Sequence, residues 1–268
     1  MFTQYCRFRL SVCFFCCLTF TTIIHAQSAR FSPFRVDTDI YADNAKAPIK
    51  RTLTLFSDGI YYDFEEAEMG LITVIDPSRS RIVLLNRQRQ VKATLDTNQV
   101  QKMVVNARTQ SDAKTTAKIA SISKSQFEKI PNGKEEAVVL NEYMEYRAST
   151  QQPNQPDMAH QYFEFANGSA QLNAIYQPKL PPYLRLELNR LIAERDLLPN
   201  EIRRITRQGG RQMELTCRII PIWQLSQDDL VKIARCGAML ADFKEVSSDD
   251  YWSQNPVIKT ATEASSTR

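Results

Sequence analysis

The sequence predicts an α+β fold, in which helices pack on one, concave face of a curved antiparallel sheet. Two hairpin patterns, in residues 51–64 and 71–85, predict the first part of the sheet. A third hairpin pattern, in residues 201–223, predicts the second part, and segments with helical spacing lie between the two. These patterns correspond to about seven to nine strands and three or four helices.

The first third of the chain has the clearest strand signals. Apolar and polar side chains alternate on both sides of Asp58-Gly59, which is the strongest short hairpin signal, and a second pair of strands flanks a turn at Asp76-Pro77. Residues 27–48 precede them as an extended segment. Five strands are predicted here, at residues 51–56, 60–64, 71–75, 81–85 and 90–95.

Helices and further strands are predicted after residue 96. An N-cap at Asp96 or Thr97 begins a helix that continues to about Ser125, and Ser226 with Asp229 resembles a capping box. Pro181-Pro182 is expected to open another helix, which ends before Pro199, and a further helix is expected at residues 227–235. Strands are expected at residues 138–148, 201–207 and 211–223, and a strand or loop at residues 242–252.

Residues 159–176 are compatible with two structures. A spacing close to 3.5 residues predicts a helix with an aromatic face. Asn167-Gly168 in the middle of the segment instead indicates a hairpin turn. The spacing favours the helix, and the hairpin remains the alternative. The residues that carry the spacing are Tyr162, Phe165, Ser169, Leu172 and Tyr176.

Residues 1–26 are typical of a secretory signal peptide. Arg7 and Arg9 precede an apolar run, and the small residue Ala26 is expected at the cleavage site. The run is shorter than the ~20 residues of a membrane-spanning helix, so cleavage is favoured over anchoring, and no membrane span is expected in the mature protein. The expected organisation is a secreted or periplasmic protein with one α+β domain at residues 27–252 and a disordered polar tail at residues 253–268.

Composition excludes several classes of function. The formal net charge is +4, and it is nearly neutral after the leader, so nucleic acid is not an expected partner. Seven glycines form no glycine-rich nucleotide loop, and His160 is the only histidine after the leader. No catalytic residue, cofactor or metal site is predicted, and an enzyme is not favoured. Cys217 and Cys236 could pair in an oxidising compartment or remain as buried thiols.

Two resemblances add to this description. Residues 53–64, 72–77 and 81–85, with residues 165–174 and 180–189, resemble uncharacterised secreted proteins of planctomycete-type bacteria, a family with no assigned activity. The strand, Asp-Pro turn and strand of residues 73–84 are similar to an element of LolA-type periplasmic lipoprotein carriers. This second resemblance implies a strongly curved sheet with helices in its concavity and a cavity for acyl chains.

The candidate ligand-binding residues are apolar side chains that could line a cavity between sheet and helices: Tyr62, Phe64, Tyr162, Phe165, Leu172 and Tyr176. An ordinary packed core would use the same residues. The leading hypothesis is a non-enzymatic protein that binds an apolar, lipid-like ligand or an envelope component. The alternative is a structural or protein-interaction module of the cell envelope. A cavity of a few hundred Å³ would favour the first, and a filled interior the second.

Overall fold

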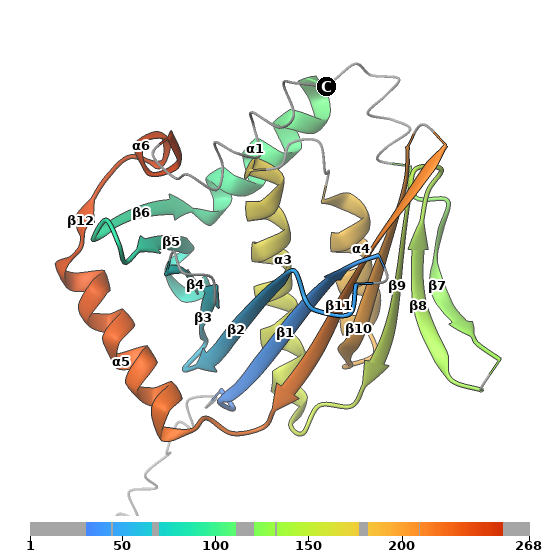
Figure 1. Ribbon diagram of the computed structural model, residues 1–268, viewed down its shortest axis with the longest axis horizontal. Helices are drawn as coiled ribbons and strands as arrows, with labels where there is room; N and C mark the ends of the chain where they lie inside the picture. The colour runs from blue at the N-terminus through green and yellow to red at the C-terminus, as the bar shows by residue number, and fades with distance from the viewer. Residues whose placement is uncertain are drawn as a thin grey trace, which may run out of the picture. The chain divides into compact units, whose positions relative to one another are not determined.

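A twelve-stranded sheet, antiparallel except for one pairing at its edge, runs through the described part of the chain (Figure 1). The structure is a computed structural model that describes residues 31–43, 45–65, 70–110, 121–131, 133–176, 182–208 and 210–253, without the side chains of residues 106–110, 176 and 208. The chain divides into two units, Met1–Arg30 and Phe31–Arg268, and only the second contains described residues. The predicted signal peptide therefore lies outside them, as does the predicted tail apart from Ser253.

Two meanders form the sheet. The first consists of β1 (Phe34–Ala42), β2 (Lys50–Ser57), β3 (Ile60–Glu65), β4 (Leu71–Asp76), β5 (Arg81–Asn86) and β6 (Val91–Asp96). The second consists of β7 (Lys124–Lys129), β8 (Glu135–Leu140), β9 (Met144–Gln151), β10 (Leu198–Gln208) and β11 (Arg211–Ile222). β1 pairs with β11 and joins the meanders, which leaves β7 at one edge and the short β12 (Lys244–Glu245), parallel to β6, at the other.

Turn chemistry explains why the first meander forms where the sequence predicts it. Asp58 and Gly59, between β2 and β3, have φ values of 52° and 71°, the left-handed conformation that a two-residue hairpin turn requires. Between β4 and β5, Asp76 caps a single 3-10 turn, Pro77–Arg79, and its carboxylate accepts a hydrogen bond from the Ser78 hydroxyl at 2.6 Å. All five strands predicted in this part of the chain are confirmed.

Five helices accompany the sheet within the described residues: α1 (Thr97–Gln110), α3 (Pro156–Tyr176), α4 (Tyr183–Ala193), α5 (Gln227–Asp242) and α6 (Ser248–Ser253). The predicted caps are confirmed for two of them. At α1 the Asp96 carboxylate accepts from the Gln99 amide at 3.0 Å, and at α5 Ser226 and Asp229 form a reciprocal capping box. No helix in the described ranges is both long and apolar enough to cross a membrane.

The ambiguous segment is a helix. α3 continues without interruption through Asn167 and Gly168, so the hairpin alternative is wrong. The glycine is explained by packing, because a Cβ atom at Gly168 would lie 3.0 Å from Cδ1 of Ile75 on β4. A small residue therefore lets the helix lie close to the sheet, and it does not mark a turn.

Three other predictions are corrected. The helix that begins at Thr97 does not extend to Ser125, because β7 begins at Lys124. The single strand expected at residues 138–148 is two strands, β8 and β9, and the Asn141 side chain accepts from the Met144 amide in the turn between them. The extended segment before the first hairpin contains β1, a central strand. These additions explain why there are twelve strands and not seven to nine.

Apolar residues of the sheet form two clusters on its opposite faces, because successive side chains of a strand alternate between faces. One cluster contains Phe56 and Tyr61 of the sheet and packs against α3 and α4. The other contains their neighbours Leu55 and Tyr62 and packs against α5, which buries Cys236 there. The prediction that helices cover a single face is therefore wrong for α5.

The sheet curves around α3 and α4, which lie side by side between its two halves (Figure 1). The two helices are inserted between β9 and β10, which are neighbours in the sheet. α4 contacts β7 to β10, whereas α3 reaches β4 through Gly168. One pair of helices thus touches strands from both meanders.

Candidate functional site

A cavity of about 350 Å³ lies between α3 and the sheet, on the face that α3 and α4 cover. Its lining comes from β1 to β5, β11, α3, the first turn of α4 and α6. The helix residues include Phe165, Ser169 and Leu172 of α3 and Arg185 of α4. The cavity is therefore built from segments that are far apart in the sequence.

Strand pairing arranges the floor of the cavity in rows. In one row Thr38 of β1 lies opposite Thr52 of β2 and Ile219 of β11. In the next row Ile40 of β1 lies opposite Lys50 and Cys217. Residues two apart on a strand share a face, so both rows point toward α3. The floor combines apolar, hydroxyl and charged groups.

An aromatic cluster closes the cavity at one end. The Phe56 ring stacks on Phe34 with 4.0 Å between ring centroids, and Phe165 meets Phe56 edge-on at 5.5 Å. The Tyr61 hydroxyl donates a hydrogen bond to the Glu164 carboxylate, and burial raises the pKa of Tyr61. Phe165 belongs both to this packed cluster and to the cavity lining, so the core and the open volume meet at this residue.

Two carboxylates of β3 line the floor, and sequence reasoning missed both. The Glu65 carboxylate lies 3.0 Å from the Lys50 ammonium group, and Asp63 accepts from the Thr54 hydroxyl at 2.8 Å. Burial raises the pKa of Asp63 to about 6, against the opposing effects of Thr54 and Lys50. Asp63 can therefore exchange a proton near neutral pH. Asp63 is two residues from Tyr61 on β3, so the alternation of side chains along the strand could have predicted that the two share a face.

The titration of Asp63 gives a prediction about stability. Its pKa is higher in the folded chain than the ordinary 3.8, so its stabilising contribution is fully present below pH 3.8 and is lost as the pH rises through about 6. Asp63→Asn keeps an acceptor for Thr54 and should raise the free energy of unfolding at pH 8 by about 2 kcal/mol. Urea denaturation at pH 8 and pH 4.5 should show this gain shrinking at the lower pH. Asp242→Asn, at an exposed position, is the control, and equal gains at both pH values would contradict the prediction.

The predicted site residues fall into two groups. Tyr162, Phe165 and Leu172 line the cavity, as expected. Tyr62 and Phe64 were wrongly assigned to it, because they lie on the opposite face of β3, in the cluster that packs against α5. The side chain of Tyr176 lies outside the described residues. Alternation alone shows that neighbouring residues face apart, and it does not show which face meets α3.

Cys217 and Cys236 are free thiols that lie on opposite faces of the sheet. Cys217 lines the cavity, whereas Cys236 of α5 is fully buried in the other cluster. The disulfide considered from the sequence is therefore not formed, and the free-thiol alternative describes the structure. Burial raises the pKa of both thiols, that of Cys236 to about 12.

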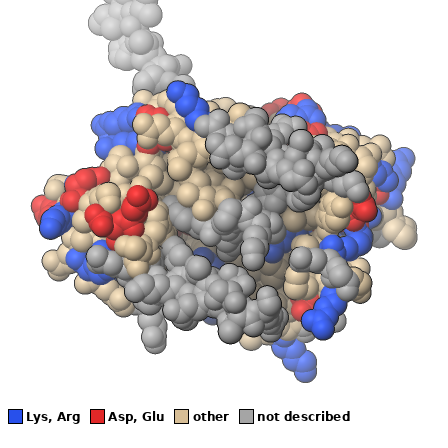
Figure 2. Space-filling model, turned by 90° about the horizontal axis from the view of Figure 1, so that it is seen from above, with Lys and Arg blue, Asp and Glu red and all other residues tan. Residues whose placement is uncertain are grey.

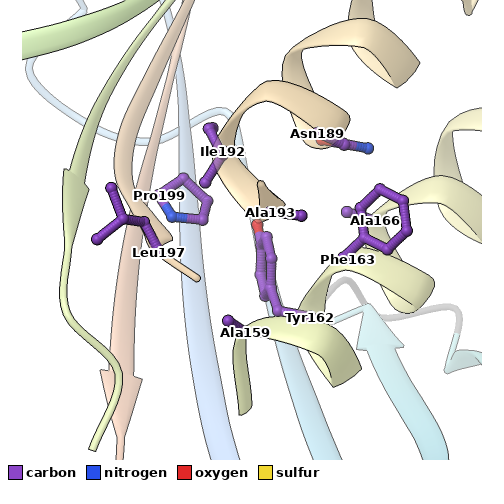
Figure 3. Close-up of a pocket in the computed structure, with 9 residues that line it drawn as sticks. All are labelled: Ala159, Tyr162, Phe163, Ala166, Asn189, Ile192, Ala193, Leu197 and Pro199. Carbon is purple, nitrogen blue, oxygen red and sulfur yellow. The ribbon is translucent and has the colours of Figure 1, made fainter. Parts of the chain in front are cut away.

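A much smaller cavity, of about 10 Å³, lies where α3, α4 and the start of β10 meet. Figure 3 shows Ile192 of α4 and Pro199 of β10 on one side of Tyr162, and Phe163 beside Ala166 of α3 on the other side. This volume is enough for about one water molecule. The junction between the two helices is thus closely packed, in contrast to the sheet side of α3.

The surface and the donor set restrict what the described residues could bind. In the view of Figure 2, basic and acidic side chains lie in small groups around the rim, without a large block of one sign among the coloured residues. In the described ranges, no group of three or more His, Cys, Asp or Glu residues is placed to hold a metal ion. No protein-family model and no curated protein matches the chain.

Proposed function

We propose that this chain is a secreted or periplasmic, non-enzymatic protein that binds an apolar, lipid-like ligand in the cavity beneath α3. The cavity volume, about 350 Å³, carries the proposal. Ligand pockets range from about 300 to 1,000 Å³, whereas packed interiors have few voids larger than a water molecule. The signal-peptide pattern of residues 1–26 supports the location outside the cytoplasm.

The lining supports an apolar ligand in particular. Leu172 and Phe165 of α3 face Ile40 and Ile219 of the floor, and Leu84 extends the apolar surface onto β5. Removing apolar surface from water gains about 25 cal/mol for each Å². A hydrocarbon chain in this space would gain that energy, and the hydroxyl groups on the floor would lie beside it.

The arrangement of elements supports a relationship to LolA-type carriers as part of the proposal. That resemblance implies a strongly curved antiparallel sheet with helices in its concavity, and the position of α3 and α4 inside the curve of the sheet supports it (Figure 1). The element of residues 73–84 that carries the resemblance lies within β4, Pro77–Arg79 and β5. α5, on the other face, departs from the implied pattern. The relationship to uncharacterised secreted proteins of planctomycete-type bacteria stays a prediction.

A structural or protein-interaction module of the cell envelope is the second candidate. The packing of α3 against α4 favours it, because the cavity at their junction holds only about 10 Å³. Under this hypothesis the larger cavity would have no occupant. Binding measurements on the purified protein separate the two candidates.

Leu172→Asp should weaken uptake of the hydrophobic fluorophore N-phenyl-1-naphthylamine at least tenfold. The substitution places a carboxylate in the apolar part of the cavity, where an unpaired charge is costly. Fluorescence titration of the mature protein measures the effect, and native mass spectrometry with lipid extraction identifies a co-purified ligand.

Two variants serve as controls for this experiment. Leu230→Asp makes the same change at an exposed position of α5 and should retain uptake. Ser169→Phe fills the cavity without burying a charge and should reduce uptake in a protein that remains folded by circular dichroism. Absence of uptake by the wild type, or unchanged uptake by both cavity variants, would overturn the proposed function.

A further inference from the structure

Arg185 is a cation of the cavity lining that has no carboxylate partner among the described residues. It lies in the first turn of α4, and its guanidinium donates to the hydroxyl oxygen of Tyr162. A partly buried charge is normally paired, because its removal from water is costly. Arg185 therefore offers hydrogen-bond donors that the described part of the chain leaves open to an anion.

Arginines on the opposite face of the same sheet differ from Arg185. Arg203 of β10 lies 2.9 Å from Glu136, and Arg207 lies 2.6 Å from Glu145. Arg147 of β9 also pairs with Glu145, at 2.5 Å. On this face, away from the cavity, glutamates of the chain itself therefore neutralise the arginines. The contrast indicates that the open guanidinium is a property of the cavity and not of the chain as a whole.

A second arginine adds positive charge to this side of the cavity. Ile202 of β10 lies opposite Cys217 of β11, so Arg204, two residues further along β10, is on the face of Cys217. Burial raises the pKa of the Cys217 thiol, and the charges of Arg185 and Arg204 act against that rise. Arg204, too, has no carboxylate at ion-pair distance in the described ranges. The carboxylates of the cavity are on β3, and β2 and β1 separate them from β11. Positive charge therefore gathers beside β11, whereas the negative charges are on β3, where Asp63 also acts on the Tyr162 hydroxyl.

We infer that the ligand of this cavity is an anionic amphiphile, whose head group pairs with Arg185 and whose apolar part lies against Leu172 and Ile219. The inference rests on the proposed function, because it names the chemistry of a ligand in the same cavity. A guanidinium binds carboxylate and phosphate oxygens through paired, charge-assisted hydrogen bonds. Head groups of either kind have the required chemistry, and the experiment distinguishes them.

The test measures displacement of N-phenyl-1-naphthylamine from the mature protein by dodecanoate, dodecyl phosphate, dodecanol and dodecyltrimethylammonium. These competitors share one hydrocarbon chain and differ in head group. The wild type should bind at least one anionic competitor roughly 10- to 100-fold more tightly than dodecanol, as expected of a charge-assisted pair. The tighter of the two anions identifies the head group as a carboxylate or a phosphate.

Arg185→Gln should remove this preference and keep the affinity for dodecanol, whereas Arg185→Lys should retain part of it. Arg190→Gln is the matched control, because Arg190 is exposed on the same helix and pairs with Glu187. Equal binding of anionic and neutral competitors by the wild type, or a preference for the cation, would overturn the inference and leave the proposed function intact. Because the comparison of competitors uses the wild-type protein, its result does not depend on whether a variant folds. Failure of every competitor and of the fluorophore to bind would overturn the proposed function itself.

Discussion

Replacing Phe56 by alanine should lower the free energy of unfolding by about 4 kcal/mol, because the substitution opens a large void in a closely packed core. Phe56 is fully buried between the sheet and α3. It stacks on Phe34, lies 5.2 Å from the Tyr61 ring and contacts Phe165 edge-on. Urea or guanidinium denaturation, followed by circular dichroism, measures the loss.

Phe127→Ala is the matched control for this prediction. Phe127 is on the edge strand β7, is only partly buried and has the Arg195 guanidinium 3.6 Å from the centre of its ring. The same change there should cost about 1 kcal/mol, because little apolar area is lost and the edge can relax. Equal losses at the two positions would contradict the packing described for the closed end of the cavity.

Asp76→Asn should lower the free energy of unfolding by about 3 kcal/mol at pH 7. Asp76 is almost fully buried between β4 and β5, and it accepts hydrogen bonds from Ser78, Arg79 and Arg81. Removing the charge leaves Arg79 and Arg81 without a negatively charged partner. It also places the NH2 group of asparagine, a hydrogen-bond donor, next to groups that are themselves donors. Ser78→Ala, which deletes one neutral donor, is the control and should cost about 1 kcal/mol.

The effect of Asp76 depends on pH in a defined direction. Burial alone would raise its pKa, but hydrogen bonds from Ser78 and Arg81 outweigh burial and hold the pKa below the ordinary 3.8. A carboxyl with a lowered pKa stabilises the fold above pH 3.8, and this contribution is lost as the pH falls through the folded-state value. The stability difference between wild type and Asp76→Asn should therefore narrow below pH 4 in denaturation experiments. A difference that stays constant down to pH 2 would contradict this.

Local chemistry made much of the secondary structure predictable. Asp58-Gly59 adopts the left-handed conformations of a tight turn, which these two residue types favour wherever they occur. Ser226 and Asp229, which cap α5, are only three positions apart in the sequence. The α+β class, with a large antiparallel sheet, follows from such signals. Spacing was also sufficient to place Tyr162, Phe165 and Leu172 on one face of a helix that lines the cavity.

Strand faces were harder to assign, although one signal was present. All four residues at positions 82–85 of β5 are buried, and an uninterrupted apolar run of this kind indicates a strand covered on both faces. That signal would have predicted a helix on the second face, where α5 lies. With both faces covered, the adjacent tyrosines Tyr61 and Tyr62 are both buried, so their residue type does not show which of them faces α3. Only packing against α3 or α5 distinguishes them.

The sequence by itself determined the hairpin turns, the helix caps and the aromatic face of α3, because each depends on residues a few positions apart. Tertiary structure decided that Asn167-Gly168 continues a helix, since the reason is Ile75 on β4, far away in the chain. It also decided that Asp63 and Arg185 face one cavity, because only the curvature of the sheet brings β3 and α4 together. Contacts between distant segments depend on how whole elements pack, and no local pattern of residues encodes that packing.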